Sequence, residues 1–134
     1  MAGVWEMYKG KNIIALCTSR VQDRYHSLFI RELNSRLKSM NCMLLVYNIC
    51  SDLLWYSNEL DWHNSVSRTD LAVFELMRPD ITDAVIVMDD RIKGRSVVEK
   101  IIKRFNNADV PVMVIDGKYE NTVHIGFEYT SGMR

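Results

Sequence analysis

The run Ala84-Val85-Ile86-Val87-Met88 is the feature that most restricts the fold, because it is wholly apolar and ends abruptly in two carboxylates, Asp89 and Asp90. A continuous apolar run bounded by polar residues is typical of a strand that is buried on both faces. One helical pattern stops before it at Arg78-Pro79, and another starts after Gly94. The run is therefore predicted to be the middle strand of a β-α-β-α series. In such folds, functional residues lie just past the carboxyl ends of the strands.

Further apolar runs predict the remaining strands, and residues with helical spacing separate several of them. The predicted strands outside the central run are 13–17, 43–47, 112–115 and 123–127, and the predicted helices are 23–40, 66–77 and one that starts at Ser96. Strands joined by helical crossovers are parallel, and the crossovers are right-handed. The predicted fold class is α/β: a three-layer α/β/α sandwich with a parallel five-stranded sheet of order 2-1-3-4-5. The loops after the first and third strands would then share a crevice at the switch point.

Several local features refine these predictions. Asn41 occupies a position where a left-handed residue ends a helix, and the spacing of Ser96 and Glu99 matches a capping box. The connection 48–64 is long for such a fold, and long connections in compact domains are usually functional or disordered. Its aromatic residues argue against disorder. Trp55, Tyr56 and Trp62 either stack on a ligand or cover the sheet edge or a dimer contact, and burial is the favoured interpretation.

Composition limits the classes of function. The chain has 134 residues, which fits one domain, and its 17 basic and 17 acidic residues give no net charge. The chain therefore lacks the excess of basic residues that would indicate nucleic-acid binding. Cys17, Cys42 and Cys50 are an odd number without metal-ligand spacing, which favours a reducing, cytoplasmic location. Residues 1–11 contain no apolar block, so we expect no signal peptide there, and no apolar run is long enough to cross a membrane.

The chain carries no recognisable catalytic motif. The glycines are too scattered to form a phosphate loop or a dinucleotide fingerprint, and no nucleophile elbow is present. His26, His63 and His124 have no partner at a useful spacing, so neither a metal site nor a general base is predicted. We therefore expect a non-enzymatic chain without a cofactor.

Five segments resemble parts of one known fold family. They are the first strand with Tyr25 early in the following helix, and the segments 41–48, 78–87, 110–116 and 123–132. In order and spacing, these segments resemble the first lobe of the type I periplasmic-binding-protein fold, which also forms the regulatory core of lac-repressor-like transcription factors. The resemblance implies a lobe that binds a small molecule and closes on it together with a second lobe.

The resemblance also implies which side chains meet the ligand. The family binds its ligand at the loops that follow the strands, with polar side chains on hydroxyl groups and an early aromatic on the ring. By position, these residues are Ser19, Arg20, Asp23, Tyr25, Ser51, Asp52, Asp89, Asp90, Asp116 and Lys118. Alternatives remain for several of them. Asp23 is favoured as a helix cap, Tyr25 as partly core, and Asp89-Asp90 fit a turn and helix approach equally well.

The segment 47–55 resembles the sensor regions of some bacterial signalling proteins of the diguanylate-cyclase (GGDEF) type. Only eleven residues precede Asn12, so we expect no DNA-binding head in this chain. We expect residues 1–11 to be an extension and residues 12–134 to be a single lobe cut from a longer two-lobe sensor. An enzymatic output domain, such as a diguanylate cyclase, would then belong to the full-length protein.

Three functions follow from the sequence. The first is a non-catalytic lobe that senses a sugar-like or nucleoside-like molecule in a cytoplasmic signalling or regulatory protein. This protein is expected to form a homodimer, and this chain is expected to contact neither nucleic acid nor membrane. The second is a phosphoacceptor receiver domain, with Asp89 or Asp90 as the acceptor. Thr18-Ser19-Arg20 replaces the acidic pair that a receiver needs after its first strand, which ranks this function lower. The third is a dimerisation lobe that no longer binds ligand.

Overall fold

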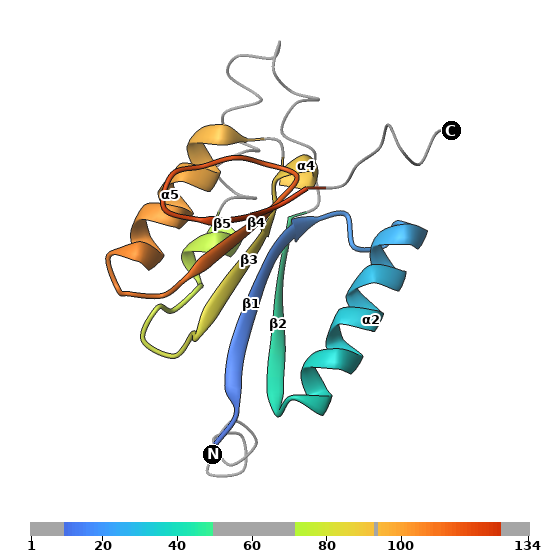
Figure 1. Cartoon of the computed structure of the whole chain (residues 1–134). Coiled ribbons are helices and arrows are strands. Elements are labelled where there is room, and N and C mark those ends of the chain that lie inside the picture. Colours follow the sequence, from blue (N-terminus) through green and yellow to red (C-terminus); the bar gives the residue numbers. More distant parts are fainter. Residues whose placement is uncertain (1–9, 50–71, 93, 127–134) are drawn as a thin grey trace.

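The computed structural model describes residues 10–49, 72–92 and 94–126 (Figure 1). Its elements, in chain order, are β1 (Asn12–Ser19), α2 (Arg24–Ser39), β2 (Cys42–Ile49), β3 (Ala84–Met88), α4 (Asp89–Ile92), α5 (Arg95–Asn106), β4 (Val112–Ile115) and β5 (Val123–Ile125). Residues 72–75 are also helical. The predicted strands and the helices of the described ranges are therefore present, whereas Ser51, Asp52, Trp55, Tyr56 and Trp62 lie outside these ranges.

The five strands form one parallel sheet with the order β2-β1-β3-β4-β5. In register, Ile14 of β1 lies beside Leu44 of β2 on one side and Ala84 of β3 on the other. The middle of β1 is fully buried, because both edges and both faces of this strand are covered. The predicted strand order is confirmed, and the switch point lies between β1 and β3.

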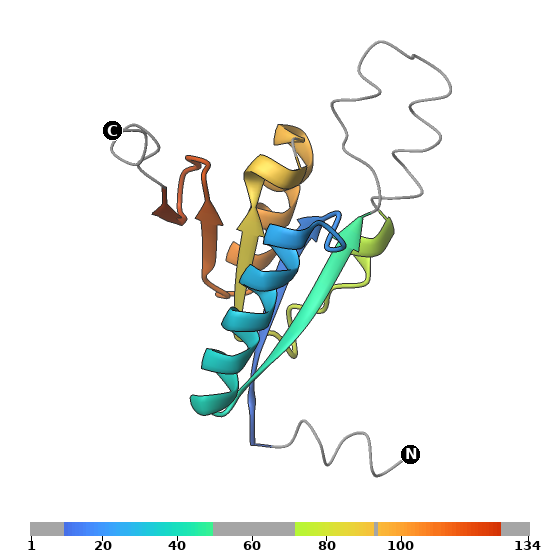
Figure 2. The ribbon, with the colours of Figure 1, turned by 90° about the vertical axis from the view of Figure 1, so that its right-hand side faces the viewer.

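Helices cover both faces of the sheet, which gives the predicted three layers (Figure 1). The crossover through α2 leads from β1 outward to β2, whereas the crossover through α5 leads in the opposite direction, from β3 to β4. Right-handed crossovers that run in opposite directions place their helices on opposite faces. Figure 2 shows α2 lying along one face, with α5 behind the sheet.

Two apolar cores fill the spaces between the layers. The larger core joins the sheet to α5 and to the helical residues 72–75, with Phe74, Met77 and Phe105 among its buried side chains. The smaller core lies beneath α2, where Phe29 and Leu33 pack against buried sheet residues. Strand alternation divides the sheet residues between the cores, since successive side chains point to opposite faces. Both cores hold the carboxyl ends of β1 and β3 in fixed positions.

Some local predictions are corrected by the structure. Tyr25 is exposed rather than partly core, because His26, Phe29 and Leu33 form the stripe that faces the sheet, and Tyr25 lies on its flank. The capping box is wrong: α5 begins at Arg95 after Gly94, so Ser96 lies inside the helix, and Glu99 pairs instead with Arg95 at 3.1 Å.

The crossover between β4 and β5, residues 116–122, contains no helix. Its Tyr119 packs against the larger core, so the crossover lies on the α5 side of the sheet. Among the described residues, none covers the other face of β5, where the Val123 and Ile125 side chains are exposed. Asp116 and Asn121 have positive φ angles of 59° and 58°, which allow the chain to turn sharply at each end of this short connection.

Candidate functional site

The loop after β1 is fixed by hydrogen bonds to the end of β2. The backbone N–H of Arg20 donates to the Ile49 carbonyl at 3.0 Å, and that of Val21 donates to Asn48 Oδ1 at 3.2 Å. Arg20 has a φ of 54°, a left-handed conformation that turns the chain out of the sheet. The side chains of Arg20 and Asp23 are thereby placed at the carboxyl edge of the sheet.

The short helix α4 follows directly on β3, at the same edge as the loop after β1 (Figure 1). Ser19, the last residue of β1, donates from Oγ to the Arg91 carbonyl at 2.6 Å. This hydrogen bond ties α4 to the end of β1 across the switch point. Ser19 is itself buried, so it positions the site rather than facing solvent.

Four side chains of alternating charge form what we call the strand-end charge cluster: Arg20, Asp23, Arg91 and Asp90. Arg20 Nη2 lies 3.1 Å from Asp23 Oδ2, and Arg91 Nη1 lies 3.7 Å from the same oxygen. Arg91 Nε lies 3.6 Å from Asp90 Oδ2. Each side chain is about a third exposed, with exposed fractions between 34% and 38%. The cluster therefore bridges the ends of β1 and β3 and remains open to solvent.

The charge state of Asp90 is set mainly by its surroundings. Burial raises the pKa of the Asp90 carboxyl above its usual value, because desolvation disfavours the charged form. The Arg91 guanidinium lowers this pKa, the Asp116 carboxylate raises it, and His26 lowers it. Asp90 therefore interacts electrostatically with Asp116 and with His26 at one end of the sheet.

Asp89 has a different role from its neighbour. Its Oδ1 accepts a hydrogen bond from the Tyr119 hydroxyl at 2.6 Å, which ties the crossover after β4 to α4. Gly117 lies so close that a Cβ at its position would be 2.8 Å from the Asp89 Cβ. Asp89 is thus packed beneath the crossover, although the sequence placed both aspartates equally at the site.

The predicted site residues divide into distinct groups. Arg20, Asp23 and Asp90 belong to the strand-end charge cluster, Ser19 supports it, and Asp116 lies within its electrostatic reach. Tyr25 is 81% exposed, and Lys118 is exposed on the crossover after β4. Ser51 and Asp52 lie outside the described residues. Asp23 precedes α2, but its side chain makes no capping hydrogen bond and pairs with the arginines instead.

The sequence analysis missed Arg91 and His26. Arg91 directly follows the two aspartates, so a search for opposite charges at the strand end would have found it. His26 is 2% exposed, and its Nδ1 lies 3.3 Å from the Arg20 carbonyl oxygen. Its position in the first turn of α2, three residues after Asp23, could have indicated that His26 lies near the predicted site. In the part of the chain that the structure describes, no group of three or more His, Cys, Asp or Glu side chains could hold a metal ion.

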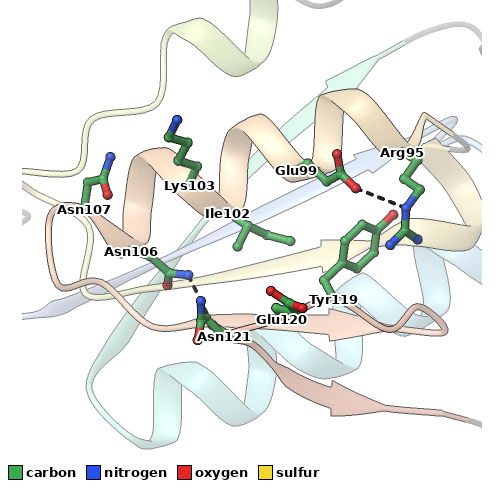
Figure 3. Close-up of a pocket in the computed structure, with 9 residues that line it drawn as sticks. All are labelled: Arg95, Glu99, Ile102, Lys103, Asn106, Asn107, Tyr119, Glu120 and Asn121. Carbon is green, nitrogen blue, oxygen red and sulfur yellow. Dashed lines mark hydrogen bonds and ion pairs between the residues drawn. The ribbon is translucent and has the colours of Figure 1, made fainter.

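A groove of about 440 Å³ lies between α5 and the crossover after β4 (Figure 3). Its walls are joined at both ends, by Arg95 above the Tyr119 ring at 4.5 Å and by the Asn106 amide, which donates to the Asn121 carbonyl at 3.2 Å. Figure 3 shows Ile102 between these two contacts. These contacts hold the crossover, and through Tyr119 they support Asp89.

Comparison with known proteins supports the fold. No known family profile and no curated protein matches the sequence. Among solved structures, the lac repressor dimer bound to operator and the anti-inducer ONPF matches with a TM-score of 0.58 and 13% sequence identity. The match covers 97% of this chain and 40% of the repressor chain. The chain thus has the α/β architecture of a lac-repressor-like lobe and spans less than half of that protein's length.

No helix within residues 10–49, 72–92 and 94–126 combines the length and the apolar character that a membrane-spanning helix needs.

Proposed function

We propose that this chain is a non-catalytic, ligand-binding lobe that senses a sugar-like or nucleoside-like molecule at the strand-end charge cluster. One observation carries the proposal: the alternating charges bridge the ends of β1 and β3 at the switch point and remain about a third exposed. Ligands of open α/β sheets bind outside the carboxyl ends of strands at this point.

The geometry of the cluster fits a neutral ligand with hydroxyl groups. The distances from Arg91 to Asp23 and to Asp90, 3.7 and 3.6 Å, exceed those of good hydrogen bonds. Arg91 Nη1 and Asp23 Oδ2 therefore retain hydrogen-bonding capacity, whereas Arg91 Nε is buried beside Asp90. A hydroxyl group donates and accepts, so it can bridge a carboxylate and a guanidinium. Two positive and two negative side chains cancel, which favours a ligand without net charge.

The proposal also includes a second lobe that binds the same ligand, and a regulatory output. The lac repressor dimer in the matching structure is bound both to its operator and to the anti-inducer ONPF. The similar fold supports the proposal that this chain, too, belongs to a protein that combines ligand binding with a regulatory output. We propose that residues 12–134 form one lobe, residues 1–11 an extension, and a homodimer the working form. Ligand would favour the closed arrangement of two lobes and shift the population of output states. A cytoplasmic signalling protein with a GGDEF-type output remains the preferred setting.

The contacts of the first and third strand ends count against a receiver domain. At the end of β1, Thr18 and Ser19 are buried, and the Ser19 hydroxyl is bound to Arg91. At the end of β3, the Asp89 carboxylate accepts the Tyr119 hydroxyl. A phosphoacceptor needs a free carboxylate beside acidic metal ligands. Asp89 is bound by Tyr119, Asp90 lies 3.6 Å from Arg91, and the end of β1 supplies no acidic ligand.

A nuclear magnetic resonance screen tests the proposal directly. Uniformly ¹⁵N-labelled chain is titrated with a panel of monosaccharides and nucleosides. We expect one compound class to shift the backbone amide signals of Arg20, Asp23 and Arg91. Arg20→Met should weaken binding by roughly tenfold or more, because hydrogen bonds to charged groups contribute about 1.5–3 kcal/mol.

Arg36→Met is the matched control, because Arg36 pairs with Glu32 on the exposed side of α2. This variant should bind like the original chain. Equal weakening in both variants, or shifts confined to residues away from the cluster, would contradict the assigned site. If no sugar or nucleoside shifts the amides, sensing of these compounds by this lobe is overturned, and light scattering would then test the dimerisation function.

A further inference from the structure

The strand β2 forms one edge of the sheet and lacks the features that usually protect such an edge. It pairs with β1 on one side, and no element in the described part of the chain pairs with its other side (Figure 2). Its eight residues, CMLLVYNI, include no charged residue and no proline. Edge strands that avoid pairing with other chains are usually charged, interrupted by proline or very short, as β5 is with three residues. The edge of β2 is therefore suited to accept an additional strand.

The hydrogen bonds to β1 show which residues of β2 have free backbone groups. The Ile49 carbonyl accepts the Arg20 N–H at 3.0 Å, so Ile49 directs its backbone groups towards β1. Successive residues of a strand direct these groups to opposite edges, and the register of β1 and β2 is uninterrupted. Leu45 therefore also faces β1, whereas Leu44 and Val46 direct their N–H and C=O groups to the open edge.

A groove of about 520 Å³ lies between β2 and α2, and we call it the β2 edge groove. Apolar and polar side chains line it together: Val21, Ile30, Leu44 and Val46 with Ser27, Arg31 and Asn34. The Val46 side chain is 40% exposed. An extended segment that pairs with the open edge would place alternate side chains in this groove. In such strand addition, backbone hydrogen bonds supply affinity and the side-chain pockets supply specificity.

Basic residues lie along the side of α2 that borders the β2 edge groove. Arg24, Arg31 and Lys38 recur every seven residues, which places them in one stripe along the helix. All three are exposed, and none forms an ion pair with a described residue. By contrast, Arg36 on another side of α2 pairs with Glu32 at 3.0 Å. The border of the groove thus carries positive charge that no described acidic residue neutralises.

We propose that the β2 edge groove binds an extended, acidic segment of a partner protein, which joins the sheet as a further strand beside β2. The backbone of the segment pairs with Leu44 and Val46, and its acidic side chains lie against Arg31 and the rest of the basic stripe. None of the four side chains of the strand-end charge cluster lines this groove. The inference therefore holds whether or not the cluster binds a ligand.

Charge favours this partner over a second copy of the chain. Antiparallel pairing of two β2 edges across a two-fold axis would place the two α2 helices side by side on one face. The basic stripes of Arg24, Arg31 and Lys38 would then face each other, and like charges across an interface are unfavourable. An acidic segment meets the same stripe with opposite charge.

Two synthetic octapeptides with blocked ends test the proposal by nuclear magnetic resonance. One alternates valine with glutamate, and the other alternates valine with lysine. In an extended strand, alternation places all charged side chains on one face, where they can meet the stripe on α2. We expect only the valine–glutamate peptide to shift the amide signals of Arg31, Leu44 and Val46, and added salt to weaken its binding. Equal shifts with both peptides, or no shifts with either, would overturn the proposal.

A charge-reversing variant tests the role of the stripe. Arg31→Glu should weaken binding of the valine–glutamate peptide by about fivefold or more, because an attractive contact becomes a repulsive one. Arg36→Glu is the matched control, since it changes the net charge by the same amount on the same helix but lies away from the groove. This control should bind like the original chain. Equal weakening in both variants would show unspecific attraction and exclude the assigned groove.

Amide hydrogen exchange tests the backbone pairing in the unmodified chain. Without peptide, the amide hydrogens of Leu44 and Val46 should exchange faster than that of Leu45, and saturating valine–glutamate peptide should slow the exchange of the first two. Slow exchange at all three positions without peptide would show that the edge is already covered. If light scattering then gave twice the mass of the chain, a second copy would be the occupant, and the acidic segment would be ruled out.

Discussion

Asp83 is a single residue that joins the two central strands. Its carboxylate accepts a hydrogen bond from the Ile13 backbone N–H at 2.7 Å, and its own N–H donates to the Ile13 carbonyl at 2.8 Å. Ile13 is buried in β1, whereas Asp83 is exposed at the entrance to β3. The pair fixes the register of β1 against β3 at the amino end of the sheet, opposite the strand-end charge cluster.

Replacing this carboxylate tests the contact. Asp83→Ala should lower the free energy of unfolding by about 1–3 kcal/mol, because the Ile13 N–H loses a charged acceptor. Urea unfolding followed by circular dichroism measures the change. Glu120→Ala removes an exposed carboxylate for comparison and should change stability by less than about 0.5 kcal/mol. A similar small loss in Asp83→Ala would show that solvent replaces the carboxylate at no cost.

At the scale of elements, the crossover after β4 holds α4 in place through the hydrogen bond from Tyr119 to Asp89, which we call the brace. Parallel strands usually need a crossover of about a dozen residues or more, commonly a helix, but residues 116–122 form a shorter, helix-free connection. Hydrogen bonds replace the missing helix: Tyr119 holds Asp89, and Thr122 Oγ1 donates to the Tyr119 carbonyl at 2.8 Å. The crossover thus fixes the beginning of α4, and with it the position of Asp90.

Tyr119→Phe removes this brace with little change in shape. We expect a loss of about 1 kcal/mol in the free energy of unfolding and altered amide signals for Asp89 and Asp90. Burial, followed by the hydrogen bond to Asp89, raises the pKa of Tyr119. The folded state therefore keeps the phenol proton above about pH 10, where an unfolded tyrosine loses it.

The free energy of unfolding should consequently fall as pH rises from about 10 towards the raised pKa of Tyr119 in the folded state. Tyr119→Phe should lack this part of the pH dependence. Tyr25→Phe is the control, because Tyr25 is exposed on α2. An identical alkaline profile in wild type and Tyr119→Phe would contradict the assignment of the brace.

At the scale of the whole molecule, Cys17 lies on the central strand β1 and belongs to the larger core. Its thiol is fully buried and its Sγ lies 3.4 Å from Met77 Sδ. Burial raises its pKa, so the reactive thiolate is disfavoured. Opening of the central strand requires disruption of the layers on both faces.

Cys17 should therefore react with N-ethylmaleimide only when the whole fold opens. In native protein, Cys42, which is half-buried at the start of β2, should react much faster. Quenched labelling followed by peptide mass analysis measures both rates, and the Cys17 rate should increase with urea in step with global unfolding. Comparable rates for the two thiols in native protein would show that β1 opens locally.

The sequence predicts the sheet better than the site, for physical reasons. Apolar runs identify buried strands, and the rules of handedness then restrict the strand order, so the arrangement around Ala84–Met88 could be predicted. Asp89 and Asp90 are equivalent in sequence, but the first turn of α4 directs one towards Tyr119 and the other towards Arg91. Tyr119 follows Asp89 by 30 residues, and no local pattern encodes that hydrogen bond.

The central position of β1 has a consequence for synthesis on the ribosome. Its partner β2 follows soon after it, but its other neighbour, β3, arrives much later: the contact between Ile13 and Asp83 spans 70 residues. Until β3 has been translated, one edge of an apolar strand stays open. Unpaired strand edges on incomplete chains favour association with other chains. The nascent protein is therefore most vulnerable to aggregation between the completion of β2 and the release of β3 from the exit tunnel.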